Sequence, residues 1–312
     1  MRLLLLLPLL IGIGAANAAE DLSAAIENTR AACGGIGAEL NDMKTMAGIN
    51  TAVTGVGTVA GGVALGTGIA KTNVDKEIDD LEKRIAELER SRADVPVEQI
   101  TIENRAEFNR QLSDFVNSYT AELQQARDEL SAAEQKSKNL GNWRTGTLAT
   151  STATNIAGAV IAGTNRVRGD LQSKIDNCLA SVKQLSAVRM QARMDGTATD
   201  AELTRVENIV RACDAWATVD VSSIDNKSTG ATVSAGVGAG LGLAGTIISA
   251  SANSQTVRDG DANKEKNLNT AANVLAGGTT VASATATVFN ATQIGAIKRA
   301  AAVADECEGA LK

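Results

Sequence analysis

Residues 50–73 read NTAVTGVGTVAGGVALGTGIAKTN. Three further windows have the same character and length, at residues 142–165, 230–253 and 267–290. Each window spans 24 residues and ends in Asn, and the only charges in the four are Lys71 and Arg144. Self-similarity of this kind marks repeat architectures. The sequence therefore predicts four related helices that are rich in Gly, Ala and Thr.

The composition excludes most catalytic chemistry. The chain has 312 residues and no His, which removes imidazole bases, histidine metal ligands and Ser-His or Cys-His relays. Only two Pro interrupt a sequence rich in helix-forming residues, so we expect an all-α fold of long antiparallel hairpins. The net charge of -6 argues against nucleic acid as a partner.

The N-terminus has the pattern of a secretory signal peptide. Met1 and Arg2 precede a short apolar run that ends in Ala15-Ala16-Asn17-Ala18, an Ala-x-Ala cleavage pattern. We expect cleavage after Ala18, and the short apolar run disfavours the alternative of an uncleaved anchor. Export to a cell envelope permits disulfides, and secretion from the cell is the alternative destination.

The cysteines predict a duplication. Cys33 precedes the first window by the same spacing that separates Cys213 from the third, and Cys178 and Cys307 follow the second and fourth. In an antiparallel hairpin, facing residue numbers add to a constant. Cys33 and Cys178 add to 211, Cys213 and Cys307 add to 520, and the centres of the paired windows add to about 215 and 520. This favours those two disulfides, with Cys178 to Cys213 as the rival pairing.

The chain thus divides into a signal peptide (1–18), a first half (19–195) and a second half (196–312). A coiled-coil stalk is predicted within the first half at 74–138, where apolar residues recur at heptad spacing among charges. Its hairpin would place Leu88 opposite Leu123 and Leu81 opposite Leu130, with the tip between Asp94 and Glu103. Between the halves, Thr199 followed by Glu202 predicts a helix capping box.

Small residues at four-residue spacing predict close helix packing of the glycine-zipper kind. The candidate packing residues are Gly57, Gly61, Gly62, Gly66, Gly238 and Gly242. Such residues are poor helix formers in water but allow close backbone approach in lipid.

The windows are long enough to span a bilayer, because 24 helical residues measure about 36 Å. Their many Thr, Ser and Asn make insertion energetically marginal, and the Lys and Arg counts near their ends choose no orientation. Two alternatives therefore stay open: membrane-inserted hairpins, or a Gly/Ala-packed bundle that is soluble or buried in a larger assembly. If the helices span, all four cysteines fall on the exported side and the stalk on the other.

Each candidate ligand-binding motif lacks a required feature. Gly240, Gly242 and Gly245 spell GxGxxG, but no strand precedes them. A calcium-loop pattern that begins at Asp259 has Lys264 where Gly is required. Four isolated cysteines without a CxxC pair predict no metal site. We therefore expect no catalytic residue, cofactor, metal or small-molecule ligand.

These patterns favour a non-enzymatic exported structural or assembly protein of a cell envelope, which self-associates as a homo-oligomer and has membrane lipid as a further candidate partner. An oligomeric pore and a soluble secreted interaction module are the alternatives.

Overall fold

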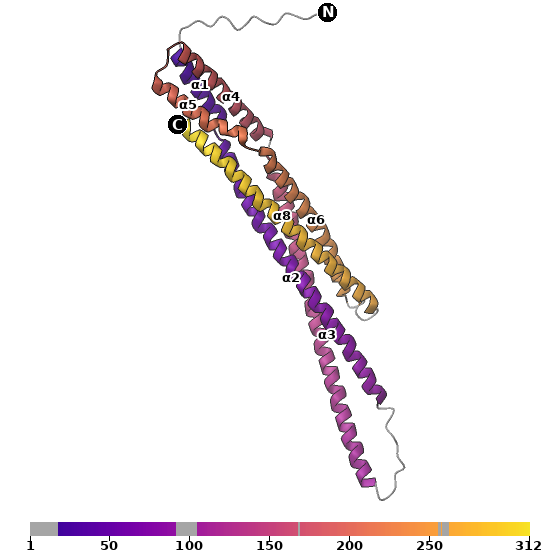
Figure 1. Cartoon of the computed structure of the whole chain (residues 1–312). Coiled ribbons are helices and arrows are strands. Elements are labelled where there is room, and N and C mark those ends of the chain that lie inside the picture. The colour runs from indigo at the N-terminus through magenta and orange to yellow at the C-terminus, as the bar shows by residue number, and fades with distance from the viewer. Residues whose placement is uncertain (1–17, 92–104, 168, 255–256, 258–261) are drawn as a thin grey trace, which may run out of the picture. The chain divides into compact units, whose positions relative to one another are not determined.

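The computed structural model describes residues 18–91, 105–167, 169–254, 257 and 262–312 (Figure 1). Within these ranges the chain is all-α, as predicted, and contains no strand. The predicted signal peptide up to Asn17 and the predicted stalk tip lie outside the described residues. The elements are α1 (Ala18–Cys33), α2 (Ile36–Ser91), α3 (Arg105–Thr164), α4 (Gly169–Met194), α5 (Asp200–Asp214), the 3-10 helix η1 (Ala215–Thr218), α6 (Val221–Ala252) and α8 (Ala262–Ala310).

The helices form two compact units. Unit 1 comprises residues 1–51, 161–231 and 288–312, and unit 2 comprises residues 52–160 and 232–287. Helices α2, α3, α6 and α8 each contribute residues to both units. Each unit also contains residues from both predicted halves. This is because each residue of a long hairpin contacts the helices that lie beside it at the same level.

Unit 1 has a conventional apolar core. Helix α4 packs against both α1 and α5. Trp216 of η1 is only 2% exposed, and burial of each large side chain contributes about 1.5–3 kcal/mol. The fully buried apolar side chains include Ile36, Leu40, Leu171, Leu185, Ile209, Ile224, Ile297 and Leu311.

The short connections of unit 1 use expected turn chemistry. Gly35, between α1 and α2, has φ 82°, and Gly196, between α4 and α5, has φ 65°, a region that favours glycine. The capping box is confirmed: the backbone N–H and hydroxyl of Thr199 both donate to Glu202 Oε2 at 2.8 Å. These hydrogen bonds lower the pKa of Glu202, and bonds from Ser222 lower that of Asp220 before α6.

Unit 2 brings together the predicted hairpin partners. A Cβ at Gly57 of α2 would meet Thr154 of α3. Further along, Gly68 lies against Arg144, so rising numbers on α2 face falling numbers on α3. Gly245 of α6 lies against Leu275 of α8. Both hairpins are therefore antiparallel, as the sequence predicts.

The two hairpins also pack on each other. Gly61 of α2 lies against Thr280 of α8, and Gly238 of α6 lies against Asn155 of α3. Arg144 of α3 hydrogen-bonds Ser249 of α6. Unit 2 is therefore a four-helix bundle in which each helix is antiparallel to both neighbours.

The stalk arms lie side by side as an antiparallel pair. Arg84 of α2 pairs with Glu129 of α3 at 3.7 Å, and Arg127 of α3 pairs with Glu89 of α2 at 3.1 Å. Ala126 is fully buried between the arms. The supercoil of these arms stays a prediction.

Candidate functional site

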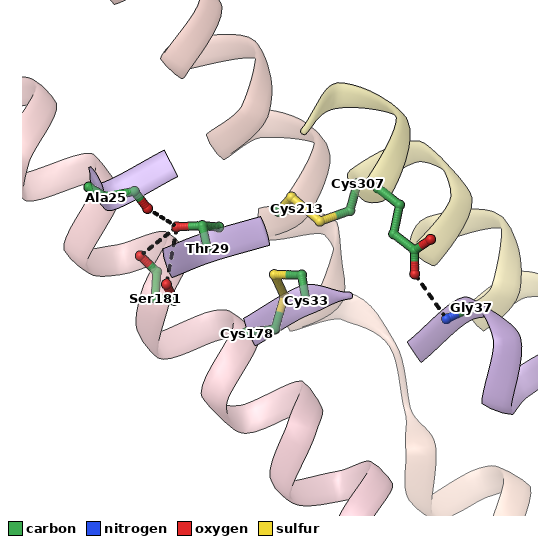
Figure 2. Close-up of a disulfide and its surroundings, with 9 residues drawn as sticks. Ala25, Thr29, Cys33, Gly37, Cys178, Ser181, Cys213 and Cys307 are labelled. Atoms are coloured by element: carbon green, nitrogen blue, oxygen red, sulfur yellow. Dashed lines mark hydrogen bonds between the residues drawn. A yellow bond between two sulfur atoms is a disulfide. The ribbon is translucent and has the colours of Figure 1, made fainter. Parts of the chain in front are cut away.

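Four helices of unit 1 meet at two neighbouring disulfides (Figure 2). Cys33 of α1 is bonded to Cys178 of α4, and Cys213 of α5 to Cys307 of α8. These are the pairs that the antiparallel symmetry favours over Cys178 to Cys213. The sulfurs of Cys33, Cys213 and Cys307 lie within 4.8 Å of one another. Because all four sulfurs are in disulfides, they offer no thiolate to a metal ion.

Hydrogen bonds fix the helices beside these disulfides. The Thr29 hydroxyl donates to the Ala25 carbonyl at 2.8 Å and lies 3.1 Å from the Ser181 hydroxyl, which connects α1 to α4 (Figure 2). The Gly37 N–H donates to a Glu308 carboxylate oxygen at 3.3 Å, which connects α2 to α8. The site is a structural clamp of four helices in an apolar surrounding.

Removal of the first disulfide should destabilise the protein strongly. Cys33 and Cys178 are separated by 145 positions, so their bond restricts a long loop of the unfolded chain. The double variant Cys33→Ala/Cys178→Ala should lose about 2–5 kcal/mol of unfolding free energy in urea titrations followed by circular dichroism. Non-reducing peptide mapping of the wild type supplies the control, and a peptide that joins Cys178 to Cys213 would contradict the pairing.

The interior of unit 2 is polar, unlike that of unit 1. Apart from alanine and glycine, its buried apolar residues are Val74 and Leu148. The Asn155 amide donates to the Ser283 hydroxyl at 2.8 Å across the bundle. The buried polar side chains of this unit are Thr54, Lys71, Ser137, Arg144, Ser151, Thr152, Asn155, Ser249, Asn269, Thr279 and Ser283.

Two buried cations occupy one end of this interior. The Lys71 side chain is 0% exposed, and its ammonium lies 2.8 Å from carboxylate oxygens of both Asp75 and Glu265. Asp75 also accepts from the Ser137 hydroxyl at 2.6 Å. Loss of one partner from such a pair typically costs about 3–5 kcal/mol, because it leaves a buried charge uncompensated.

Arg144 extends the network to the other helices. Its guanidinium donates to Ser249 Oγ at 2.8 Å and to Asn269 Oδ1 at 2.7 Å. The Asn269 amide donates in turn to Asp75 at 3.2 Å. Residues from α2, α3, α6 and α8 are thus connected, and the two cations are balanced by Asp75 and Glu265.

A polar groove of about 360 Å³ lies beside the network. Its lining includes the carboxylates of Asp75, Asp79, Glu82, Glu134 and Glu265. In the part of the chain that the structure describes, these carboxylates do not gather at metal-ligand spacing. The groove therefore gives no set of metal ligands.

The structure divides the six predicted packing glycines. A Cβ at Gly57, Gly61, Gly238 or Gly242 would collide with a side chain of a neighbouring helix. Gly62 and Gly66 are exposed and a Cβ there would meet nothing within 4 Å, so they do not pack within the chain. Four-residue spacing alone cannot separate the inner from the outer side of a helix.

Sequence reasoning missed Gly68, Gly141 and Gly245, which also touch neighbouring helices. The signal that could have found two of them is an alternation of three- and four-residue steps, which keeps residues on one helix face. It runs through Gly57, Gly61, Ala64 and Gly68, and through Gly238, Gly242, Gly245 and Ser249.

Large aliphatic side chains are exposed on the outer surface of unit 2, most of them in the uncharged windows. Val59 is 68% exposed and Val274 is 69% exposed. The exposed large aliphatic residues of this unit are Val56, Val59, Val63, Ile69, Ile156, Val160, Val233, Val237, Leu243, Ile247, Val274, Val281 and, in the stalk, Leu112 and Val116.

Two helical stretches, residues 22–91 and 200–252, are long and apolar enough to cross a membrane. Their most apolar windows have mean hydropathies of 1.4 and 1.6, and only 28% of each window is buried. Most residues of each window are therefore partly or fully exposed. Comparison with known proteins adds nothing to this geometry, since no family model, curated protein or solved structure matches the chain.

Proposed function

We propose that this chain is a non-catalytic structural or assembly protein of a cell envelope, inserted in a membrane through the four uncharged helices and self-associating there. The observation that carries the proposal is the inverted polarity of unit 2. Lys71, Arg144 and Asn155 are buried, whereas Val59 and Val237 are more than half exposed.

Water and lipid favour opposite arrangements of polar and apolar side chains. In water, each Å² of exposed apolar surface raises the free energy of the folded protein by about 25 cal/mol, and a buried cation adds the free energy of its desolvation. In a bilayer, polar groups must find partners inside the protein and aliphatic groups meet acyl chains without penalty. The partnered interior of the bundle and the uncharged exterior of its four Gly-rich windows therefore favour lipid over water.

The disulfide clamp supports export. Disulfides persist in oxidising compartments, and a predicted signal peptide precedes the cysteines. Helices closed by two disulfides provide rigidity and no reactive thiol, which suits a structural role better than a catalytic one.

Self-association is supported by two matching exposed ridges. Gly62 and Gly66 on α2, and Gly236 and Gly240 on α6, are all exposed with open space around them. Each pair lies in the same outward pattern of Val, Gly, Val, Gly and a final Ile or Leu. The first ridge is Val59, Gly62, Val63, Gly66 and Ile69, and the second is Val233, Gly236, Val237, Gly240 and Leu243. Small residues between valines let helices of two chains approach closely in lipid.

A pore is the weaker alternative. The polar side chains inside unit 2 are largely occupied with one another, as in the pairs Asn155 with Ser283 and Ser151 with the Gly57 carbonyl. This pattern favours a packed core over a water-filled path. Dye release from vesicles that contain the purified protein separates the two functions.

Membrane residence can be tested by fractionation. After expression in a bacterial host, the mature protein should stay in the pellet through alkaline carbonate washing and be released by detergent. Replacement of Val59 and Val237 by Arg should shift it to the supernatant, because charges at the centre of a spanning helix cost about 2.5–3.5 kcal/mol each. Lys183→Arg, on the exposed surface of α4, is the matched control. Release of the wild type by carbonate alone would instead support a soluble secreted module.

Substitutions at the outer and inner glycines separate effects on self-association from effects on folding. The variant Gly62→Leu/Gly66→Leu should lose oligomers in crosslinking without a fall in its urea midpoint, because these residues face open space and Leu is the better helix former. Gly61→Leu should instead lose about 1–3 kcal/mol of unfolding free energy through overpacking against Thr280.

Gly295→Leu, at an exposed glycine outside both ridges, controls for the change in helix propensity. Unchanged oligomers in a variant with Leu at all four ridge glycines would contradict self-association through these ridges.

A further inference from the structure

We propose that unit 1 carries a collar of unpaired cations that binds the anionic headgroups of membrane lipids. This inference rests on the proposed membrane insertion and names the partner of that same surface. The collar consists of Lys44, Arg166, Lys227, Lys298 and Arg299.

Each of four long uncharged stretches of the sequence is bounded at one end by a collar residue. The first charge met at this end is Lys44 before residues 45–70, Arg166 after residues 145–165, Lys227 before residues 228–252, and Lys298 after residues 267–297. In each case it is a cation. Lys and Arg at the ends of spanning helices reach the headgroup region with their charged tips.

Hydrogen bonds place these cations at one level of unit 1. The Asn165 amide, next to Arg166, donates to the Met43 carbonyl, next to Lys44, at 3.0 Å. The Gln293 amide of α8 donates to the Asn165 carbonyl at 3.2 Å.

The fourth segment joins at the same level. The Val167 N–H donates to the Asp225 carboxylate at 3.0 Å, two positions from Lys227. The Ser228 hydroxyl donates to the Ala162 carbonyl at 2.6 Å. Cations from four segments of the chain therefore lie within about two helical turns of one level of unit 1.

The collar carries unbalanced positive charge. Arg166, Lys298 and Arg299 are exposed, and Lys44 and Lys227 are partly exposed. Within the described residues, none of the five forms a salt bridge. The neighbouring carboxylates are Asp42, Asp225 and Asp220, which interacts electrostatically with Lys227, so the five cations exceed the nearby negative charge.

The surface of unit 1 changes character across the collar. On one side lie exposed aliphatic residues without charges: Met46, Ile49 and Val288. On the other side the exposed surface carries charges of both signs, as in the bridge of Lys174 to Glu39 at 2.9 Å. An apolar surface bordered by unpaired cations matches acyl chains bordered by phosphates, which is why lipid headgroups fit better than a free anion.

The opposite end of the uncharged stretches has a different arrangement. There the cations that bound the first two stretches, Lys71 and Arg144, are buried, and Lys71 is paired with Asp75 and Glu265. Lys266, which precedes residues 267–297, is exposed but lies in the polar groove with carboxylates such as Glu82 and Glu134. The preference for anionic lipid should therefore be stronger at the collar end of the uncharged helices.

Vesicle flotation tests the collar with the disulfide-bonded mature protein. Vesicles of phosphatidylcholine alone are compared with vesicles that also contain phosphatidylglycerol, and partitioning is measured at low and high salt. Each cation near an anionic surface should strengthen partitioning about fivefold. Phosphatidylglycerol should therefore raise wild-type partitioning at least tenfold at low salt, and high salt should reduce this gain.

Two triple variants separate the effect of the collar cations from the effect of net charge. Lys44→Gln/Lys298→Gln/Arg299→Gln should lose at least tenfold of the phosphatidylglycerol gain and still float with phosphatidylcholine vesicles. Lys183→Gln/Arg193→Gln/Arg205→Gln, which removes exposed unpaired cations of unit 1 outside the collar, should keep the gain. Circular dichroism verifies that each variant is folded.

The outcomes are distinguishable. An equal gain in the collar and control variants would overturn the collar while leaving insertion intact. Failure of the wild type to float with either vesicle would overturn the proposed insertion itself. Abolition of the gain by inorganic phosphate at matched ionic strength would assign the cations to a free anion and overturn the lipid site.

Discussion

The close approach of four helices through small residues is the constraint on which unit 2 depends. Where Gly57, Gly61, Gly238 and Gly242 face their neighbours, the inner space has no room for large aliphatic groups. Hydroxyls and amides fill it instead, because they are short and can satisfy one another, as Asn155 and Ser283 do. The Val, Ile and Leu of the same helices then lie outside, so inverted polarity follows from the packing.

Unit 1 of the same chain has the opposite distribution of polar and apolar side chains. Its interior is filled by residues such as Leu40, Leu171 and Trp216, and its charges lie mainly at the surface. The two disulfides lie inside this apolar core, where all four sulfurs are buried. One polypeptide thus combines an apolar core in unit 1 with a polar interior in unit 2, and the proposed division into an exported part and a membrane part rests on this contrast.

Much of this architecture is visible in the sequence, and its limits have physical causes. The spacing of Cys33, Cys178, Cys213 and Cys307 indicates antiparallel hairpins because facing positions in such hairpins add to a constant. The packing of one hairpin on the other could not be predicted, since no covalent or spacing constraint joins them. The sequence groups Gly62 with Gly57 as packing residues because glycine carries no polarity that distinguishes the inner from the outer side of a helix. The neutral network around Lys71 was missed because its partners Asp75 and Glu265 come together only in the folded bundle.

Accessibility of single spin labels in reconstituted vesicles tests the inverted polarity most directly. All four native cysteines are in disulfides, so one cysteine introduced at Val59, Val237 or Val274 can be labelled selectively. Labels at these exposed aliphatic positions should relax strongly with oxygen and weakly with a water-soluble nickel chelate, because oxygen concentrates in hydrocarbon. A label at Lys183 should show the reverse. Strong relaxation by the nickel chelate at Val59 and Val237 would place these faces in water and contradict the account.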